Sequence, residues 1–208
     1  MTSFPGSPRT QRGALVSIDS VTQRPSVIPF QYNPHTLTRS FEIGGGGGGG
    51  PEAGQLARPP AESIRVELEL DASDDLELGK RSTVAARIAA LETLVLPSSA
   101  TAIANAVLAA TGTIEILPPD APLTLFVYGP SRVLPVLVKE LSVTEEAHDP
   151  SLAPTRARVA LGLRVLSWAD VGPTHPAFAL SIAQQLAKER LARSVMASSL
   201  DALSSSGN

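Results

Sequence analysis

The sequence predicts an α+β domain that is mainly β, an antiparallel β-barrel or sandwich with an inserted helix and a C-terminal helix. Residues 64–70 alternate strictly between apolar and charged side chains, which is typical of a strand with one buried face. Several strand-like segments follow one another across short turns, which favours antiparallel pairing. Between them, residues 83–96 repeat apolar side chains at spacings of three and four, as a helix does.

The first part of the chain contains short extended segments. Residues 14–21 alternate weakly and predict a strand. Residues 27–32 and 36–43 predict a second extended segment that is interrupted at Asn33-Pro34, because the residue before a proline disfavours helix. The seven glycines that follow have no side chains to bury, so we expect a mobile loop over residues 44–62.

The middle of the chain combines a strand with helices. The alternating strand at 64–70 ends in an acidic turn at 71–75, and the amphipathic helix at 83–96 follows. Residues 100–110 are rich in alanine and predict a second short helix.

The last part of the chain returns to strands and ends in a helix. Residues 123–128, 132–144 and 155–166 predict three strands, and Pro135 indicates an edge or a bulge in the second of them. Residues 176–203 carry apolar side chains at helical spacing and predict an amphipathic helix.

These elements divide the chain into three parts. Residues 1–13 form a flexible N-terminus, residues 14–170 form the β domain that contains the glycine-rich loop, and residues 171–208 form a linker with a helical extension. Hydrophobic residues make up 43% of the 208 residues, enough for one sizeable core.

Composition excludes several classes of protein. Cysteine is absent, so neither a disulfide framework nor a thiolate metal site can form. The net charge of −3 argues against nucleic acid as the main partner. No apolar run reaches the roughly 18 to 20 residues that cross a bilayer, and the N-terminus lacks a signal-peptide pattern. We therefore expect a cytoplasmic protein without direct membrane insertion.

Motifs for catalysis or for a cofactor are weak. No Gly-Lys-Ser/Thr follows the glycine run, so a phosphate cradle is disfavoured. The acidic turn lacks the glycine and the distant glutamate of a calcium loop, and no histidine has a second metal ligand at i+4. No Gly-x-Ser-x-Gly elbow is present. The sequence therefore predicts neither an enzyme nor a metal or cofactor site.

Ordered segments of the chain resemble the tube-like domain of contractile injection system proteins. The stretch Phe30-Gln31-Tyr32-Asn33-Pro34 with Leu37 resembles the opening "F-x-F/Y-N-P-x-x-L" of that domain. Further segments resemble its strands and helix in the same order: 64–71, 83–94, 118–129, 133–144 and 154–159. Two departures are Tyr128, where tryptophan is usual, and residues 148–153, which replace "F-D-x-x-G".

The resemblance implies a tail-tube-like subunit, six copies of which form a ring. Proteins of this kind lie where the inner tube meets the spike, and many carry a C-terminal LysM module, for which this chain has no room after residue 166. The implied partners are the inner tube protein, the spike protein and other baseplate subunits. The implied function is a structural subunit in a homo-hexamer, assembled in the cytoplasm into an injection particle.

A different class of function remains as an alternative, namely a ligand- or polysaccharide-binding β-barrel module. The few aromatic residues, 4% of the chain, count against a platform for sugars, and the missing catalytic set counts against a hydrolase.

Subunit interfaces are expected at two places. One is a set of charges for matching between subunits or to the lumen, and the other is the apolar face of the C-terminal helix, for which we expect docking on a partner rather than packing on its own domain. The residues are Glu67, Glu69, Arg156 and Arg158 for the charges, and Phe178, Ile182 and Leu186 for the helix.

Overall fold

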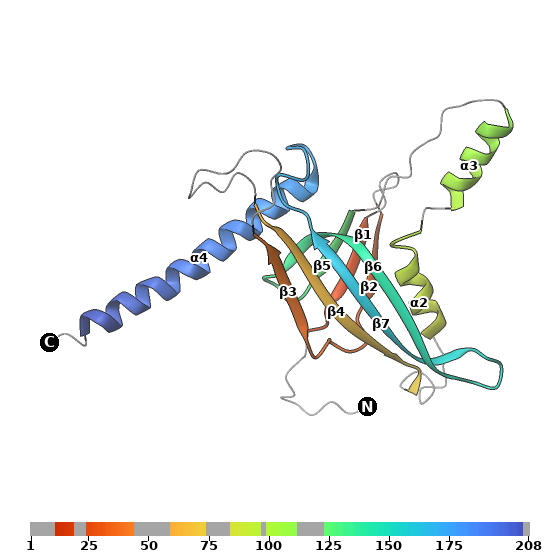
Figure 1. Ribbon diagram of the computed structural model, residues 1–208, viewed down its shortest axis with the longest axis horizontal. Helices are drawn as coiled ribbons and strands as arrows, with labels where there is room; N and C mark the ends of the chain where they lie inside the picture. Colours follow the sequence, from red (N-terminus) through yellow and green to blue (C-terminus); the bar gives the residue numbers. More distant parts are fainter. Residues whose placement is uncertain are drawn as a thin grey trace.

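The computed structural model shows an α+β fold that is mainly antiparallel β-sheet (Figure 1), as the sequence predicts. It describes residues 11–18, 24–43, 59–73, 84–96, 99–111 and 123–205. The glycine run, the proline-rich stretch at 118–122 and the last two residues of the acidic turn, 74 and 75, lie outside these residues. The described elements are β1 (Ala14–Ile18), β2 (Pro25–Pro29), β3 (Leu37–Glu42), β4 (Ala61–Asp71), α2 (Val84–Glu92), α3 (Ser99–Ala110), β5 (Leu123–Val127), β6 (Val133–His148), β7 (Pro154–Val165) and α4 (Pro176–Ser205).

The sheet has seven strands in the order β2-β1-β5-β6-β7-β4-β3, and it is not closed into a barrel. The prediction of barrel closure is wrong because β2 and β3 do not pair: they lie at opposite edges of the sheet, although they are neighbours in the sequence. The link between them, residues 30–36, spans at most about 24 Å when fully extended. The sheet must therefore curve strongly enough to bring its two edges near each other.

The core lies between the curved sheet and α2. Helix α2 buries Val84, Ile88 and Leu91, and it packs against β2, β4 and β7. The predicted helix at 83–96 is thus confirmed over Val84–Glu92 and in its buried face, and turns follow it over residues 93–96. Helix α2 contacts β2 at one edge of the sheet and β4 and β7 near the other edge. It therefore covers the apolar interior that a closed barrel would have enclosed.

Strands β4 and β7 confirm the predicted alternation. Residues 62 to 71 of β4 pair with residues 165 to 156 of β7. Their inward side chains are almost fully buried, except that Val165 is only partly buried. The buried ones are Ile64, Val66, Leu68, Leu70, Ala157, Val159, Leu161 and Leu163.

The expectation of an edge strand around Pro135 is wrong. Strand β6 lies inside the sheet, between β5 and β7. Proline has no backbone N–H, and it is tolerated there because the ladder to β7 begins only at Val136. No hydrogen bond from the nitrogen of residue 135 to β7 is therefore needed. Its carbonyl accepts a hydrogen bond from the Leu166 amide at 2.8 Å. The irregularities of β6 lie further along, at 138/140 and 145–148.

Aromatic side chains fill the core beside the link between β2 and β3. The Phe126 ring lies 6.1 Å from Phe30 and 5.9 Å from Tyr128, measured between centroids. Gly13 lies so close that a Cβ atom there would be 2.6 Å from the Phe30 ring. Glycine is therefore required at this position for the aromatic packing.

Candidate functional site

The link between β2 and β3, which we call the motif loop (residues 30–36), is fixed by side-chain amides on both sides. Gln31 donates to the Asp71 carbonyl at 2.6 Å and accepts from the Asp71 amide at 3.0 Å. Asn33 donates to the Gln11 carbonyl and accepts from the Gly13 amide, each at 2.8 Å. The loop therefore joins the end of β4 to the segment that precedes β1.

The chemistry of the amide explains this double attachment. Each Gln or Asn side chain has a carbonyl acceptor and an N–H donor, as a peptide group does. Gln31 is buried and pairs with both backbone groups of Asp71, so it takes the place of a neighbouring strand at the point where β4 ends. The Asn-Pro motif singled out in the sequence thus has a structural role in the fold.

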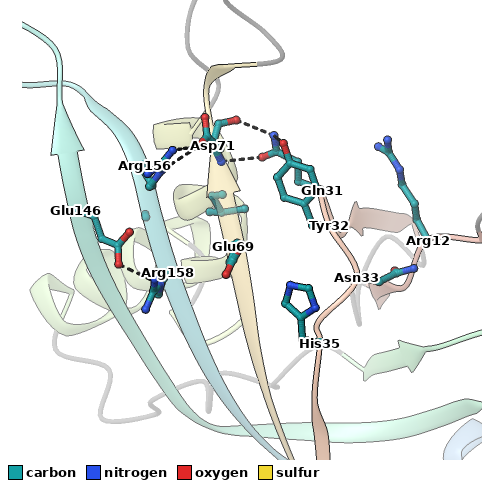
Figure 2. Close-up of a pocket in the computed structure, with 12 residues that line it drawn as sticks. Arg12, Gln31, Tyr32, Asn33, His35, Glu69, Asp71, Glu146, Arg156 and Arg158 are labelled. Carbon is teal, nitrogen blue, oxygen red and sulfur yellow. Dashed lines mark hydrogen bonds and ion pairs between the residues drawn. The ribbon is translucent and has the colours of Figure 1, made fainter.

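A cleft of 720 Å³ opens between the motif loop and the outer face of the sheet. Figure 2 shows Tyr32 and His35 on the loop side, and Glu69, Arg156 and Arg158 across the cleft on the strands. Both walls are polar and charged. The cleft is lined by Arg12, Gln31, Tyr32, Asn33, His35, Glu69, Leu70, Asp71, Glu146, Arg156, Ala157 and Arg158.

Opposite charges alternate across the strands of this wall. Arg156 pairs with Asp71 at 2.7 Å, and Arg158 lies 3.0 Å from Glu146 and 3.8 Å from Glu67. Acidic side chains of β4 and β6 thus flank basic side chains of β7. The charges are largely matched within the chain, so the cleft lacks a surplus of either sign.

Asp71 is the most perturbed of these groups. The Ser73 hydroxyl and the Ser73 amide both donate to its carboxylate, and the Arg156 guanidinium adds a hydrogen bond and a favourable charge. These interactions stabilise the ionised form and lower the pKa of Asp71 to about 2. The carboxylate therefore stays charged at any physiological pH and holds the end of β4 to β7.

The predicted interface residues fall into two separate groups. Glu69, Arg156 and Arg158 line the cleft, and Glu67 lies beside it in a smaller pocket. The apolar residues of the C-terminal helix lie elsewhere, on α4, where Phe178 and Ile182 are half-buried and Leu186 is exposed. The structure does not bring the two groups together.

Helix α4 packs on its own domain at its beginning. Ala177 is fully buried and Ser181 nearly so, and the helix contacts β6. Its later part runs past the sheet (Figure 1). Leu191, Val195 and Met196 in this helix are each more than 60% exposed. The same helix thus has a first part that packs on its own domain and a later part with exposed apolar side chains.

A buried carboxylate holds α4 to the sheet. Glu62 is 6% exposed and accepts from Arg39 at 2.7 Å and from Lys188 at 3.1 Å. Both cations also lie over the ring of Phe41, 5.4 and 5.9 Å from its centroid. This cluster joins β3, β4 and α4 at one end of the sheet.

The same end contains a second hollow, a groove of 340 Å³ that we call the α4 groove. Its walls are mainly apolar on the sheet side and polar on the helix side. It is lined by Phe41, Pro59, Pro60, Glu62, Leu134, Pro135, Val165, Leu166, Ser167, Trp168, Ser181, Gln184, Gln185 and Lys188.

Sequence reasoning missed Gln31, Glu62 and Lys188. One signal was present for Glu62, because it shares the period-two register of the buried side of β4 and therefore needed a partner. For Gln31 and Lys188 no local signal exists, since their partners are 40 and 126 residues away in the sequence.

Among the described residues, no group of three or more side chains is placed to hold a metal ion. None of the described helices has the length and apolarity that a membrane crossing needs. In comparisons with known proteins, neither a protein-family model nor a curated protein matches the chain.

Proposed function

We propose that the chain is a structural subunit of a contractile, phage-tail-like injection system. In this role it forms a homo-hexameric ring that joins the inner tube to the spike or baseplate, and it contacts the inner tube protein, the spike protein and other baseplate subunits. The resemblance of the ordered motifs suggests this function. The structural observation that carries it is a sheet with an edge available for pairing with a neighbour.

That edge is β3. Within the described part of the chain, β3 pairs with β4 alone, so its other side has free backbone donors and acceptors. It contains no proline, and Phe41 and Ile43 beside it are 45% and 79% exposed. Monomeric proteins usually protect such an edge with prolines, charges or a covering element. Strand β3 carries two charged residues, Glu42 and Arg39, and Arg39 is paired with Glu62 of the same chain. Without proline, this edge can pair with a strand of another subunit.

The opposite edge provides a contrast within the same molecule. Strand β2 begins at Pro25 and ends at Pro29, neither of which has an N–H to donate. It is therefore the poorer template for a new strand. The two edges of the sheet are therefore different, and a ring built from heterologous contacts needs two different surfaces on each subunit.

The outer face of the sheet also fits a ring. Its alternating charges are paired within the chain through Asp71–Arg156 and Glu146–Arg158. A hydrophilic, charge-matched sheet face can border a water-filled lumen without attracting cargo of either sign strongly. Of the two expected placements of Glu67, Glu69, Arg156 and Arg158, between subunits or toward the lumen, this favours the lumen.

The test compares charge substitutions at the two edges. Ile43→Lys places a cation beside the open edge, and Val27→Lys places one on the blunted edge at a side chain of similar exposure. Negative-stain microscopy of the purified chain at high concentration should show rings for the wild type and for Val27→Lys, and monomers for Ile43→Lys. A wild-type chain that stays monomeric at every concentration contradicts the proposal, all the more if it binds a polysaccharide in the cleft.

A further inference from the structure

The pairing of β4 is interrupted beside the motif loop. The ladder between β3 and β4 ends at Leu37 and Val66, and the next attachment on that side of β4 is the pair of hydrogen bonds between the Gln31 side chain and the Asp71 backbone. Between these two points, no backbone hydrogen bond joins the loop to β4 within the described part of the chain. The sheet therefore has a gap on this side of β4, at residues 67–70.

Two residues in this gap direct their backbone groups toward the motif loop. The Ala72 amide donates to the Thr155 carbonyl of β7 at 2.8 Å, and along a strand such groups point alternately to the two neighbours. The amides and carbonyls of Glu67 and Glu69 therefore point away from β7, as those of Asp71 do. Among the described residues, neither glutamate has a backbone hydrogen bond on that side.

A proline explains why the loop does not fill the gap. Continuing the β3–β4 register beyond Leu37 places Pro34 opposite Glu69. Pro34 has no N–H to donate to the Glu69 carbonyl, so the loop cannot extend the ladder there. Two adjoining hollows, of 100 and 720 Å³, lie between the loop and this part of β4. Figure 2 shows Glu69 on β4 without a dashed line to any residue of the loop.

The carboxylate of Glu69 is also without an ion pair in the described part of the chain. Glu69 lies opposite Arg158 in the β4–β7 register, but the Arg158 guanidinium lies 3.0 Å from Glu146. Arg156 is engaged in the same way by Asp71. A strand added at the gap would place one of its side chains beside the Glu69 carboxylate. Because oppositely charged neighbours attract across a ladder, that side chain should be a lysine or an arginine.

We propose that this gap is a binding site for an extended peptide segment that carries a basic residue. The segment pairs its backbone with Glu67 and Glu69 as a short added strand, and its lysine or arginine side chain lies beside the Glu69 carboxylate. A peptide is the class of ligand that fits, because another strand repeats the same alternation of N–H and C=O groups. The proposal is independent of the ring, since it uses the motif-loop side of β4 and not the free side of β3.

Fluorescence anisotropy with labelled pentapeptides tests the class of ligand on the full-length chain. The probe is Thr-Val-Arg-Val-Thr with blocked ends, and its counterpart carries glutamate in the central position. The arginine peptide should bind about fivefold more tightly or better, because a glutamate would lie beside a like charge. Equal affinities, tighter binding of the glutamate peptide through Arg12 on the other wall, or no binding at millimolar concentration would each overturn the proposal.

A pair of charge variants locates the bound peptide. Glu69→Gln keeps the size of an exposed side chain and removes its charge, so the affinity for the arginine peptide should fall by about two- to fivefold. Glu42→Gln is the matched control: it removes the same charge at the other end of the β3–β4 ladder and should leave the affinity unchanged. Equal losses in both variants would show attraction by net charge alone and overturn the site.

Amide hydrogen exchange, followed by NMR, tests the backbone pairing separately from side-chain charge. In the free chain, the amides of Glu67 and Glu69 should exchange faster than that of Arg65, which faces the ladder to β3. A saturating concentration of the arginine peptide should slow exchange at both glutamates by roughly tenfold or more. Slow exchange in the free chain would show that the gap is closed, and binding without added protection would place the peptide elsewhere. Either result overturns the proposal.

Discussion

At the scale of single residues, the fold depends on side chains that imitate the backbone. The sheet is open, and the loop between its two edge strands is fastened by Gln31 and Asn33 rather than by a seventh ladder. Phe30 places its ring in the core from the same loop, so the motif combines an apolar anchor with two polar ones. Buried hydrogen bonds of this kind contribute modestly when made and cost more when one partner is left alone.

The Gln31 attachment gives the first prediction. Gln31→Leu keeps an apolar contact of similar size but leaves the amide and carbonyl of Asp71 without their partner. The free energy of unfolding should fall by about 1–3 kcal/mol, measured in urea. Gln31→Glu is the matched control, because its carboxyl can still accept from the Asp71 amide. It can donate to the Asp71 carbonyl only when it is protonated, so it should lose less stability than Gln31→Leu only at a pH where the glutamate is protonated. An unchanged stability in Gln31→Leu would mean that the loop is held by packing alone.

The second prediction concerns pH and Asp71. Its folded pKa of about 2 lies below the ordinary value of 3.8, so its ionised form stabilises the fold. That contribution is complete above about pH 4 and is lost as the pH falls from there through about 2. The difference in unfolding free energy between wild type and Asp71→Asn should therefore shrink across this window. A difference that stays constant from pH 5 to pH 2 would contradict the assigned hydrogen bonds.

Residue roles of this kind could be predicted from the sequence only where periodicity reveals them. The four charged interface candidates of β4 and β7 were found because they alternate with apolar side chains, and the structure places them on one face. The partners of Gln31 and Glu62 come from distant segments, and no local pattern encodes such pairs.

At the scale of elements, β4 shows how strongly alternation specifies a strand. Every second residue from Ile64 to Leu70 is at most 4% exposed, and those between them face solvent. Leu68→Ala should therefore lower the free energy of unfolding by about 2–5 kcal/mol. Glu67→Ala, on the other face, is the control and should change it by less than about 0.5 kcal/mol. Similar losses of unfolding free energy in both variants would show that β4 does not have one buried face and one exposed face.

Helix α4 leads to a prediction from truncation. A chain ending after Arg190 keeps Ala177, Ser181 and the Lys188–Glu62 pair, so its stability should match that of the full chain. A chain ending after Pro173 loses these contacts and removes one cation from the buried carboxylate. It should be less stable by about 1–3 kcal/mol. Equal stability of both truncations would show that the cis contacts contribute nothing and that the whole helix is free to dock elsewhere.

The sequence predicts where the helices and strands lie along the chain better than it predicts which strands pair in the sheet. The helix at 83–96 and the strands at 64–70 and 155–166 carry strong periodicity, and all three are present. The extended segment on both sides of Asn33-Pro34 proved to be two strands at opposite edges. A proline in the sequence predicts a break there, but the distance that the chain covers after the break depends on the curvature of the whole sheet.

At the scale of the whole molecule, three features give the domain a direction. One edge of the sheet is open at β3 and the other is blunted at β2. The tip of the β6–β7 hairpin and the start of α4 lie at opposite ends of the sheet, and α4 extends beyond the sheet (Figure 1). By its length, the last part of α4, residues 189–205, reaches about 25 Å past its anchor. A subunit whose two edges and two ends differ in this way can contact different neighbours on different sides.

The central claim is that the chain is a structural part of an injection particle, and electron microscopy of the particle tests it most directly. Particles are isolated from cells with the gene intact, with the gene deleted, and with the deletion complemented by Ile43→Lys or Val27→Lys. The account predicts complete particles with the wild-type chain and with Val27→Lys, and tubes without an attached spike, or no particles, in the other two strains. Complete particles from the deletion strain would contradict it.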